Sequence, residues 1–275
     1  MAGLSEPYNE SFLPLIQKYY SLEAIAREPW HSDTILFLPS KNQMFIENGG
    51  AESIATSIYL SLLNLNHEIR YVKNVNEMSP SGKGPLLKCG KYSIGEFEPI
   101  VNFCNLKGYR LLANYLDNSK KTEIKSYILL IQKAFSETIE YLLWKNNSVQ
   151  KVIKESFNQN YSWPLNHILY LNEFYFNRNK LVSNKIWNLE KLEVLEKFRE
   201  TNDCLNKKLE GSLYLIGNNM TEADILLFSY LKVLHLYSDF DETLNLLHDF
   251  RNINDFYANM SRKLQNILME KLELN

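Results

Sequence analysis

Residues 78–101, MSPSGKGPLLKCGKYSIGEFEPIV, contain the pattern that decides the fold. Two short strand-like runs, at 85–89 and 92–94, are separated by Gly90-Lys91, which predicts a β-hairpin with a two-residue turn. The run at 96–108 ends in a glycine, a common helix stop, and predicts a helix directly after the hairpin. The stretch therefore predicts the order strand, strand, helix.

The loop before this hairpin, Ser81-Gly82-Lys83-Gly84-Pro85, superficially resembles a phosphate-binding loop. A P-loop needs an upstream glycine, a Ser or Thr after the lysine, and a helix that follows. Here Gly84-Pro85 follows the lysine, and a strand comes next. We expect the loop to position Pro85 and its strand and not to bind a nucleotide.

The residues before this loop predict a βαβ unit. A short β-type run at 34–38 is followed by a helical pattern at 48–66 and by a second β-type run at 68–72. Such a unit implies parallel pairing of its two strands. Residues 73–83 are predicted to form a loop. The order β-α-β, β-β-α is that of a thioredoxin-like domain, in which a cis-proline typically begins the third strand, and Pro85 occupies that place.

Helical patterns follow from residue 120 onward, at 121–144, 188–211 and 220–237. The last pattern is apolar on nearly all sides, which predicts a helix buried in a helical core. It opens with Thr221 and Asp224. This spacing predicts a capping box, in which the hydroxyl accepts from the backbone N–H three residues on and the carboxylate returns to the cap's own N–H.

The fold class is therefore α/β plus all-α: a thioredoxin-like domain over 31–110, followed by a helical domain over 120–275. This is the layout of glutathione transferases, in which Thr-x-x-Asp also opens the buried helix. Residues 1–30 form an N-terminal extension with an amphipathic helical pattern at 12–26. We expect that helix to pack on protein, because its polar face lacks the basic cluster of a membrane-surface helix.

Composition excludes several classes of function. Thirty basic residues against 32 acidic ones leave a net charge of −2, so nothing indicates a nucleic-acid partner. The three cysteines are unpaired by spacing and the five histidines are dispersed, so we expect no metal site and a reducing compartment. No apolar run reaches the roughly 20 residues that span a bilayer.

Glutathione chemistry is the main catalytic alternative. In transferases of this layout, an acid or amide followed by Ser at the start of the third helix binds the γ-glutamyl end of the tripeptide. This chain has Glu96-Phe97 there, so the hydroxyl is lost. The loop at 39–51, after the first strand, offers only Ser40 and neither Tyr nor Cys to activate a thiol. We therefore expect no cofactor and no transferase activity.

Residues 160–177, NYSWPLNHILYLNEFYFN, are unusually rich in aromatic side chains. Trp163-Pro164 is expected to open a helix, because proline is well tolerated in a first helical turn. Two interpretations remain open. The aromatic residues either plug an interface between the two domains or form a surface for a protein partner, where aromatic anchors are enriched.

Two motifs in combination give the chain a family resemblance: MSPSGKGPLL at 78–87 and SWPLNHIL at 162–169. With GEFEPIVNF at 95–103 and MTEADILLF at 220–228, they resemble the metaxins, and the type-2 branch most closely. The resemblance extends over roughly residues 30–240. It implies a glutathione-transferase-like fold without enzyme activity, located peripherally on the cytosolic face of the mitochondrial outer membrane.

The same resemblance implies the partners. Type-2 metaxins pair as a heterodimer with type-1 metaxin, which carries the membrane segment, so membrane contact is indirect. The pair binds the β-barrel protein of the outer-membrane sorting and assembly machinery and takes part in mitochondrial protein import. In animals it also binds motor-adaptor proteins. Five residues are expected at a partner surface: Trp163, Pro164, Asn166, His167 and Lys83. The rival function is a glutathione-dependent transferase or isomerase.

Overall fold

The structure, a computed structural model, describes residues 28–40, 49–111, 117–236, 241–272 and 274. Its first part contains a four-stranded sheet in the order β2-β1-β3-β4. Strands β1 (Ile35–Pro39) and β2 (Glu68–Val72) are parallel, whereas β3 (Leu86–Cys89) pairs antiparallel with β1 and with β4 (Tyr92–Gly95). The predicted parallel pairing of the βαβ unit and the two-residue hairpin turn are confirmed. The predicted helix at 12–26 lies outside the described residues.

Three helices belong to this part of the chain: α2 (Gly50–Leu62), α3 (Val75–Met78) and α4 (Phe97–Leu106). Helices α2 and α4 match the two predicted helices, with ends a few residues inside the predicted ones. The prediction of a plain loop over 73–83 is wrong, because the short helix α3 lies within it. Its single turn buries only Val75, which leaves too short a pattern to recognise in the sequence.

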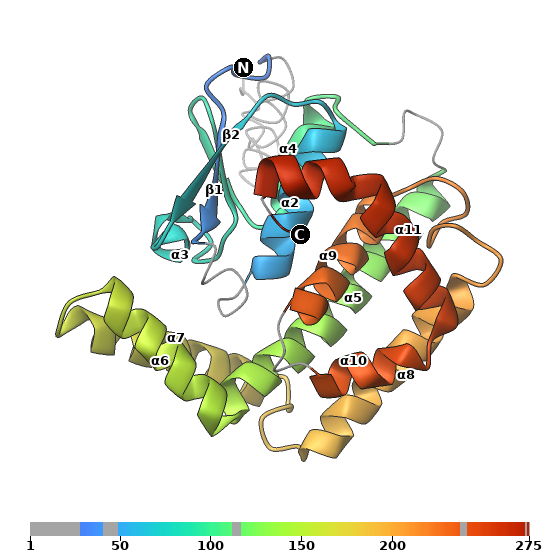
Figure 1. Cartoon of the computed structure of the whole chain (residues 1–275). Helices are drawn as coiled ribbons and strands as arrows, with labels where there is room; N and C mark the ends of the chain where they lie inside the picture. The colour runs from blue at the N-terminus through green and yellow to red at the C-terminus, as the bar shows by residue number, and fades with distance from the viewer. Residues whose placement is uncertain (1–27, 41–48, 112–116, 237–240, 273, 275) are drawn as a thin grey trace, which may run out of the picture.

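Helices form the rest of the described chain. They are α5 (Asn118–Lys145), α6 (Asn147–Asn160), α7 (Leu165–Ser183), α8 (Lys191–Lys208), α9 (Glu222–Leu236), α10 (Asp241–His248) and α11 (Arg251–Ile267), with a π-helical turn at Leu268–Leu272. Figure 1 shows α6 and α7 as a hairpin that projects from the body of the molecule, below the sheet. The other helices gather around α5 and α9.

Helix α9 lies at the centre of the molecule. Its residues from Ala223 to Leu234 are all buried, as the apolar pattern predicts, and it packs against both α2 and α5. A single large apolar cluster therefore runs from the sheet through α2 and α9 into the helical part. The two parts of the chain share one core.

The start of α9 confirms only part of the predicted capping box. The Asp224 carboxylate accepts the Thr221 N–H at 2.8 Å, as expected. The Thr221 hydroxyl also donates to the same carboxylate at 2.6 Å, a bond that the predicted capping box does not include. The other oxygen of Asp224 accepts the N–H of Leu215 at 2.8 Å. A buried carboxylate needs hydrogen-bond donors, and the bond from Leu215 attaches the preceding loop to the helix.

Candidate functional site

The first candidate site lies where transferases of this layout bind their tripeptide, at the N-terminus of α4. The Gly84–Pro85 bond is cis, as predicted, and the Pro85 carbonyl accepts the N–H of Glu96 at 2.9 Å. Glu96 has a φ of 67°. A β-carbon on Gly49, just before α2, would lie 2.6 Å from the Gly84 carbonyl oxygen. The cis-proline loop and the starts of α2 and α4 thus meet at one point.

The carboxylate of Glu52, in the first turn of α2, points at the start of α4. Its Oε2 accepts the N–H of Phe97 at 3.4 Å, and its Oε1 accepts the side-chain amide of Gln132 on α5 at 3.2 Å. Burial raises the pKa of the Glu52 carboxyl, while the hydrogen bond from Phe97 opposes that rise. The helix N–H that would suit a ligand carboxylate is therefore already bonded to a carboxylate of this chain.

Phe97 is the second residue here that departs from the transferase pattern. Its ring is fully buried and packs edge-on against Tyr59, with 6.1 Å between ring centroids. In the loop at 39–51, where transferases place their thiol-activating residue, Ser40 is partly buried, and residues 41–48 lie outside the described residues. We missed Glu52 in the sequence, although an acidic residue in a first helical turn is the signal that could have indicated an interaction with helix N–H groups.

Two of the cysteines are buried and structural. Burial raises the pKa of the Cys104 thiol to about 12, so a reactive thiolate is strongly disfavoured there. The Cys89 sulfur accepts a hydrogen bond from the Thr34 hydroxyl at 3.4 Å. These positions fit small apolar residues packed in the core, as the sequence suggested.

The second candidate site is the α6–α7 hairpin. One side of α7 packs on the body of the protein: Tyr170 and Phe174 contact Trp144 of α5, with ring centroids 6.3 and 6.1 Å from it. Two further residues of this side, Asn177 and Leu181, are fully buried. The Tyr161 hydroxyl donates to the Lys73 carbonyl at 2.7 Å and so ties the hairpin to the sheet part of the molecule.

The other side of α7 is apolar too, but it is exposed. Four exposed side chains along the helix form what we call the outer face: Leu171, Tyr175, Phe176 and Val182. Four residues at the turn and in the first helical turns form the hairpin tip: Trp163, Pro164, Leu165 and Ile168. Trp163 is 81% exposed, so the prediction that the aromatic stretch plugs a domain interface is wrong for this residue.

The five predicted partner residues fall into separate roles. Trp163 and Pro164 lie at the tip, joined by a second cis bond, and His167 is exposed beside them. Asn166 instead holds the hairpin together, because its side chain donates to the Asn158 amide oxygen at 2.7 Å and its own oxygen accepts the N–H of His167 at 2.8 Å. Within this set, Asn166 is therefore assigned a structural role.

The fifth predicted residue, Lys83, lies away from the tip but reaches the same hairpin. Its ammonium group is 5.9 Å from the ring centre of Phe176, which is cation–π distance. The loop that decides the fold and the aromatic helix, about 90 residues apart in the chain, therefore meet along the outer face. The sequence could not reveal this contact, because nothing in either pattern specifies how the hairpin folds back.

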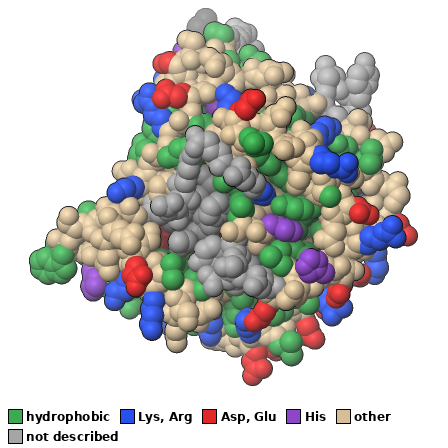
Figure 2. All heavy atoms as spheres, viewed as in Figure 1, with side chains coloured by type: hydrophobic (Ala, Val, Ile, Leu, Met, Phe, Trp, Pro, Cys, Tyr) green, Lys and Arg blue, Asp and Glu red, His purple; other side chains and the backbone are tan. Residues whose placement is uncertain are grey.

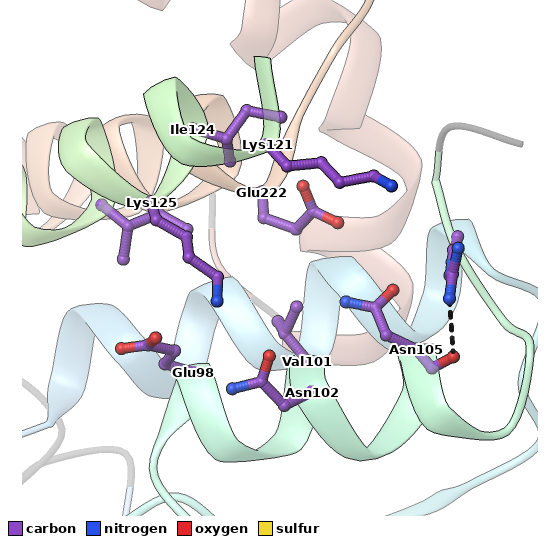
Figure 3. Close-up of a pocket in the computed structure, with 10 residues that line it drawn as sticks. Glu98, Val101, Asn102, Asn105, Lys121, Ile124, Lys125 and Glu222 are labelled. Atoms are coloured by element: carbon purple, nitrogen blue, oxygen red, sulfur yellow. Dashed lines mark hydrogen bonds between the residues drawn. The ribbon is translucent and has the colours of Figure 1, made fainter. Parts of the chain in front are cut away.

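A pocket of about 270 Å³ lies between α4, the first turns of α5, and the start of α9. Its floor is apolar, formed by Val101, Ile124 and Ile128. Figure 3 shows charged groups of opposite sign around the pocket, with Lys125 and Glu98 on facing helices and Glu222 beside Lys121. Burial raises the pKa of Glu222. None of the described lining residues carries a hydroxyl or thiol that could act as a nucleophile.

No group of three or more His, Cys, Asp or Glu suited to a metal ion occurs among the residues that the structure describes. Across the same described ranges, none of the helices combines the length and the apolar character needed to cross a bilayer.

Comparison with solved structures places the fold. A glutathione S-transferase from Xylella fastidiosa has a TM-score of 0.57 at 14% identity, over 88% of this chain and all of that one. A glutathione transferase family member from Pseudomonas fluorescens, with two glutathione molecules bound, has a TM-score of 0.54 at 13% identity, over 88% of this chain and 94% of that one. The chain thus has the glutathione-transferase-like fold, which does not by itself assign an activity.

Sequence comparison gives the family. Residues 53–173 match the Tom37 profile, described as an outer mitochondrial membrane transport complex protein, and residues 174–263 match the glutathione S-transferase C-terminal domain. Metaxin-2 of Homo sapiens is 28% identical over 89% of this chain and 93% of its own length. A metaxin-2 homolog of Caenorhabditis elegans is 30% identical over 78% of this chain and 93% of its own length. The chain therefore belongs to the metaxin family.

Proposed function

We propose that the chain is a non-catalytic adaptor subunit of a mitochondrial outer-membrane transport complex. In this proposal it pairs as a heterodimer with type-1 metaxin on the cytosolic face, within the machinery that sorts and assembles β-barrel proteins. Family membership and the matching transport-complex profile support the location. A link to motor-adaptor proteins remains a prediction of the family resemblance alone.

The exposed outer face of α7 carries the proposal. A helix that faces water on one side normally shows polar residues there, whereas α7 presents Leu171, Tyr175, Phe176 and Val182. Large apolar side chains exposed on one helix, here with the exposed Asn172 and Asn179 among them, are typical of a site of interaction. The neighbouring Lys83 adds a cation next to Phe176. Aromatic side chains among aliphatic ones have the composition of a protein interface centre, and a lysine beside them fits the polar rim.

The contacts at the start of α4 support the non-catalytic part. Glu52 accepts the Phe97 N–H, so a γ-glutamyl carboxylate would have to displace an internal one. The hydroxyl that would add a second bond is replaced by the buried phenyl ring of Phe97. Binding a carboxylate here would therefore break the bond between Glu52 and the Phe97 N–H, lack the hydroxyl bond, and bring two negative charges together, which is costly in a partly buried site.

The decisive experiment is co-expression with type-1 metaxin that lacks its membrane segment, followed by size-exclusion chromatography with light scattering. We expect a stable heterodimer. Tyr175→Ser in the outer face should weaken it by about tenfold or more, since aromatic anchors carry much of the binding energy. Leu192→Ser, at an exposed leucine on α8, is the matched control and should leave the heterodimer intact. Two separate monomers would contradict the adaptor proposal.

The rival function is a glutathione-dependent transferase or isomerase, favoured by the fold shared with the glutathione-bound Pseudomonas fluorescens structure. It predicts retention on glutathione resin and saturable turnover of a generic electrophile. We expect neither from this chain. Turnover that is lost on substitution of Pro85 or Glu96 would support the rival and exclude a purely non-catalytic role.

A further inference from the structure

The hairpin tip has a charge distribution that differs from the rest of the chain. From residue 156 to residue 172 the sequence contains no Asp, Glu, Lys or Arg. The flanking positions are charged, beginning with Glu155 before this segment and Glu173 after it. The uncharged segment includes the last residues of α6, the turn, and the first residues of α7. The end of the hairpin is therefore an uncharged projection.

This end is exposed as well as uncharged. Trp163 is 81% exposed and Ile168 is 58% exposed, while Leu165 is exposed between them. Figure 2 shows hydrophobic side chains at the far end of the hairpin, at the left of the molecule, with a histidine beside them and both basic and acidic side chains along the hairpin. In water, this amount of exposed apolar area on a projection is unfavourable, so a contact in the assembled state is expected.

Two exposed lysines, Lys151 and Lys154, precede the tip on α6, beside Glu155. The other basic residues of the hairpin lie at the far end of α7, where Lys180 pairs with Glu140. Lys151 and Lys154 are exposed on α6, and neither takes part in an ion pair within the described part of the chain. The ammonium group of Lys154 lies 6.0 Å from the ring centre of Tyr170. The positive charge of α6 is therefore available to an anionic surface.

We propose that the hairpin tip docks on an anionic lipid surface, with Trp163, Leu165 and Ile168 in the interfacial layer and Lys151 and Lys154 toward the lipid phosphates. The inference rests on the proposed place of the chain at the outer membrane. Interfacial segments enter a bilayer by about 5–10 Å. Lys154 lies six residues before the end of α6, about 9 Å along the helix axis at 1.5 Å per residue. The lysine then reaches the headgroup layer when the tip is immersed.

The shape of the tip favours lipid over a second protein. A projecting end can make only a small contact with a flat surface. A stable protein–protein interface needs a broader and complementary contact area. Tryptophan is also the side chain that favours the membrane interface most clearly, with lysine beside it reaching the phosphates. The outer face, by contrast, adjoins Lys83 and the sheet part of the molecule. We therefore assign the outer face to the protein partner, and the predicted partner residues Trp163 and Pro164 to lipid.

The test is flotation of the full chain with phosphatidylcholine vesicles that contain about one-third phosphatidylglycerol, compared with vesicles of phosphatidylcholine alone. We expect the chain to float with the anionic vesicles and much less with the neutral ones. Trp163→Ser and Leu165→Ser should each reduce the partition about fivefold or more, because binding scales with buried apolar area. Lys154→Gln should reduce it less and abolish part of its salt dependence.

Two matched controls come from the same chain. Leu192→Ser removes an exposed leucine from α8, and Lys197→Gln removes an exposed lysine from the same helix. Both should float like the unchanged chain. Circular dichroism of each variant checks that the fold persists.

Three outcomes would overturn the inference: no flotation of the unchanged chain, equal flotation of the tip variants, or equal loss in the α8 controls. The heterodimer assay separates this result from the proposed function. If Trp163→Ser prevents pairing with type-1 metaxin and vesicles are not bound, the tip is a protein contact and only the lipid inference fails. If vesicles are bound as described but no heterodimer forms, the adaptor proposal fails and the lipid contact stands.

Discussion

At the scale of single residues, Glu52 is the side chain that most distinguishes this site from a ligand-binding one. Its carboxylate is held by Phe97 and Gln132 and is partly removed from water. Burial raises its folded-state pKa above the usual 4.5 of a glutamate. The native state therefore holds this proton more tightly than the unfolded state does. The stability from this difference is fully present below about pH 4.5 and is lost as pH rises through the folded-state pKa.

Glu52→Gln tests this linkage. The amide oxygen can still accept the Phe97 N–H, but the side chain no longer titrates. We expect the free energy of unfolding of the unchanged chain to fall, relative to that of the variant, between pH 4.5 and pH 7. Urea denaturation of both proteins at several pH values measures the difference. Glu200→Gln, at an exposed glutamate, should run parallel to the unchanged chain. A parallel course for Glu52→Gln as well would show that the carboxylate is not shielded from water.

Asp224 carries a second residue-scale prediction. Three donors converge on its fully buried carboxylate: the N–H and hydroxyl of Thr221 and the N–H of Leu215. Asp224→Ala leaves all three without an acceptor, so we expect a loss of about 2–4 kcal/mol in the free energy of unfolding. Thr221→Val removes only one donor and should cost about 1 kcal/mol. Denaturant titration compares the two. Equal costs would mean that the two backbone N–H bonds, from Thr221 and from Leu215, contribute nothing.

These two acids also show what sequence can predict at this scale. Asp224 was expected because Thr-x-x-Asp is a local motif, and both of its bonds to Thr221 are local. Its bond to Leu215 and the contact of Glu52 with Phe97 join residues 9 and 45 positions apart. No local pattern contains such information. The cis bond at Pro85 was predicted because the strand order around it identified the fold.

At the scale of elements, α7 is apolar on opposite sides, and only one side is covered. Leu181 is fully buried, whereas its neighbour Val182 is 43% exposed. Leu181→Ala should therefore cost about 2–5 kcal/mol in unfolding free energy. Val182→Ala should stay within about 0.5 kcal/mol. Chemical denaturation of the two variants compares their free energies of unfolding and shows which side of α7 supports the fold. If Val182→Ala costs as much, the outer face is covered within the monomer and is not free for a partner.

The sequence located this helix but not its orientation. Its aromatic residues occur on both sides, so the pattern has no single apolar stripe from which burial could be inferred. This is why a domain-interface plug and a partner surface could not be separated beforehand. Packing of Phe174 against Trp144, more than 25 residues away, fixes which side turns inward. The exposed side then follows from geometry.

At the scale of the whole molecule, α9 makes the sheet part and the helical part depend on each other. It contacts α2 on one side and α5 on the other, within one continuous apolar cluster. A core that crosses between two parts of a chain favours a single cooperative unfolding transition. The layout of two parts could be predicted from the sequence, but this dependence could not, because an all-round apolar helix gives no indication of which neighbours cover it.

Phe228→Ala tests this dependence. The ring is fully buried in α9 and stacks on Tyr257 of α11 at 5.5 Å, so its removal should cost about 3–5 kcal/mol. If the core is cooperative, native-state hydrogen exchange should show the same loss of protection in β1 as in α5, although β1 is remote from the substitution in sequence. Leu129→Ala, at an exposed leucine on α5, should lower the protection of neither β1 nor α5. A loss confined to the helices would show that the sheet part is stable alone, and α9 would then be a contact between independent units and not their common core.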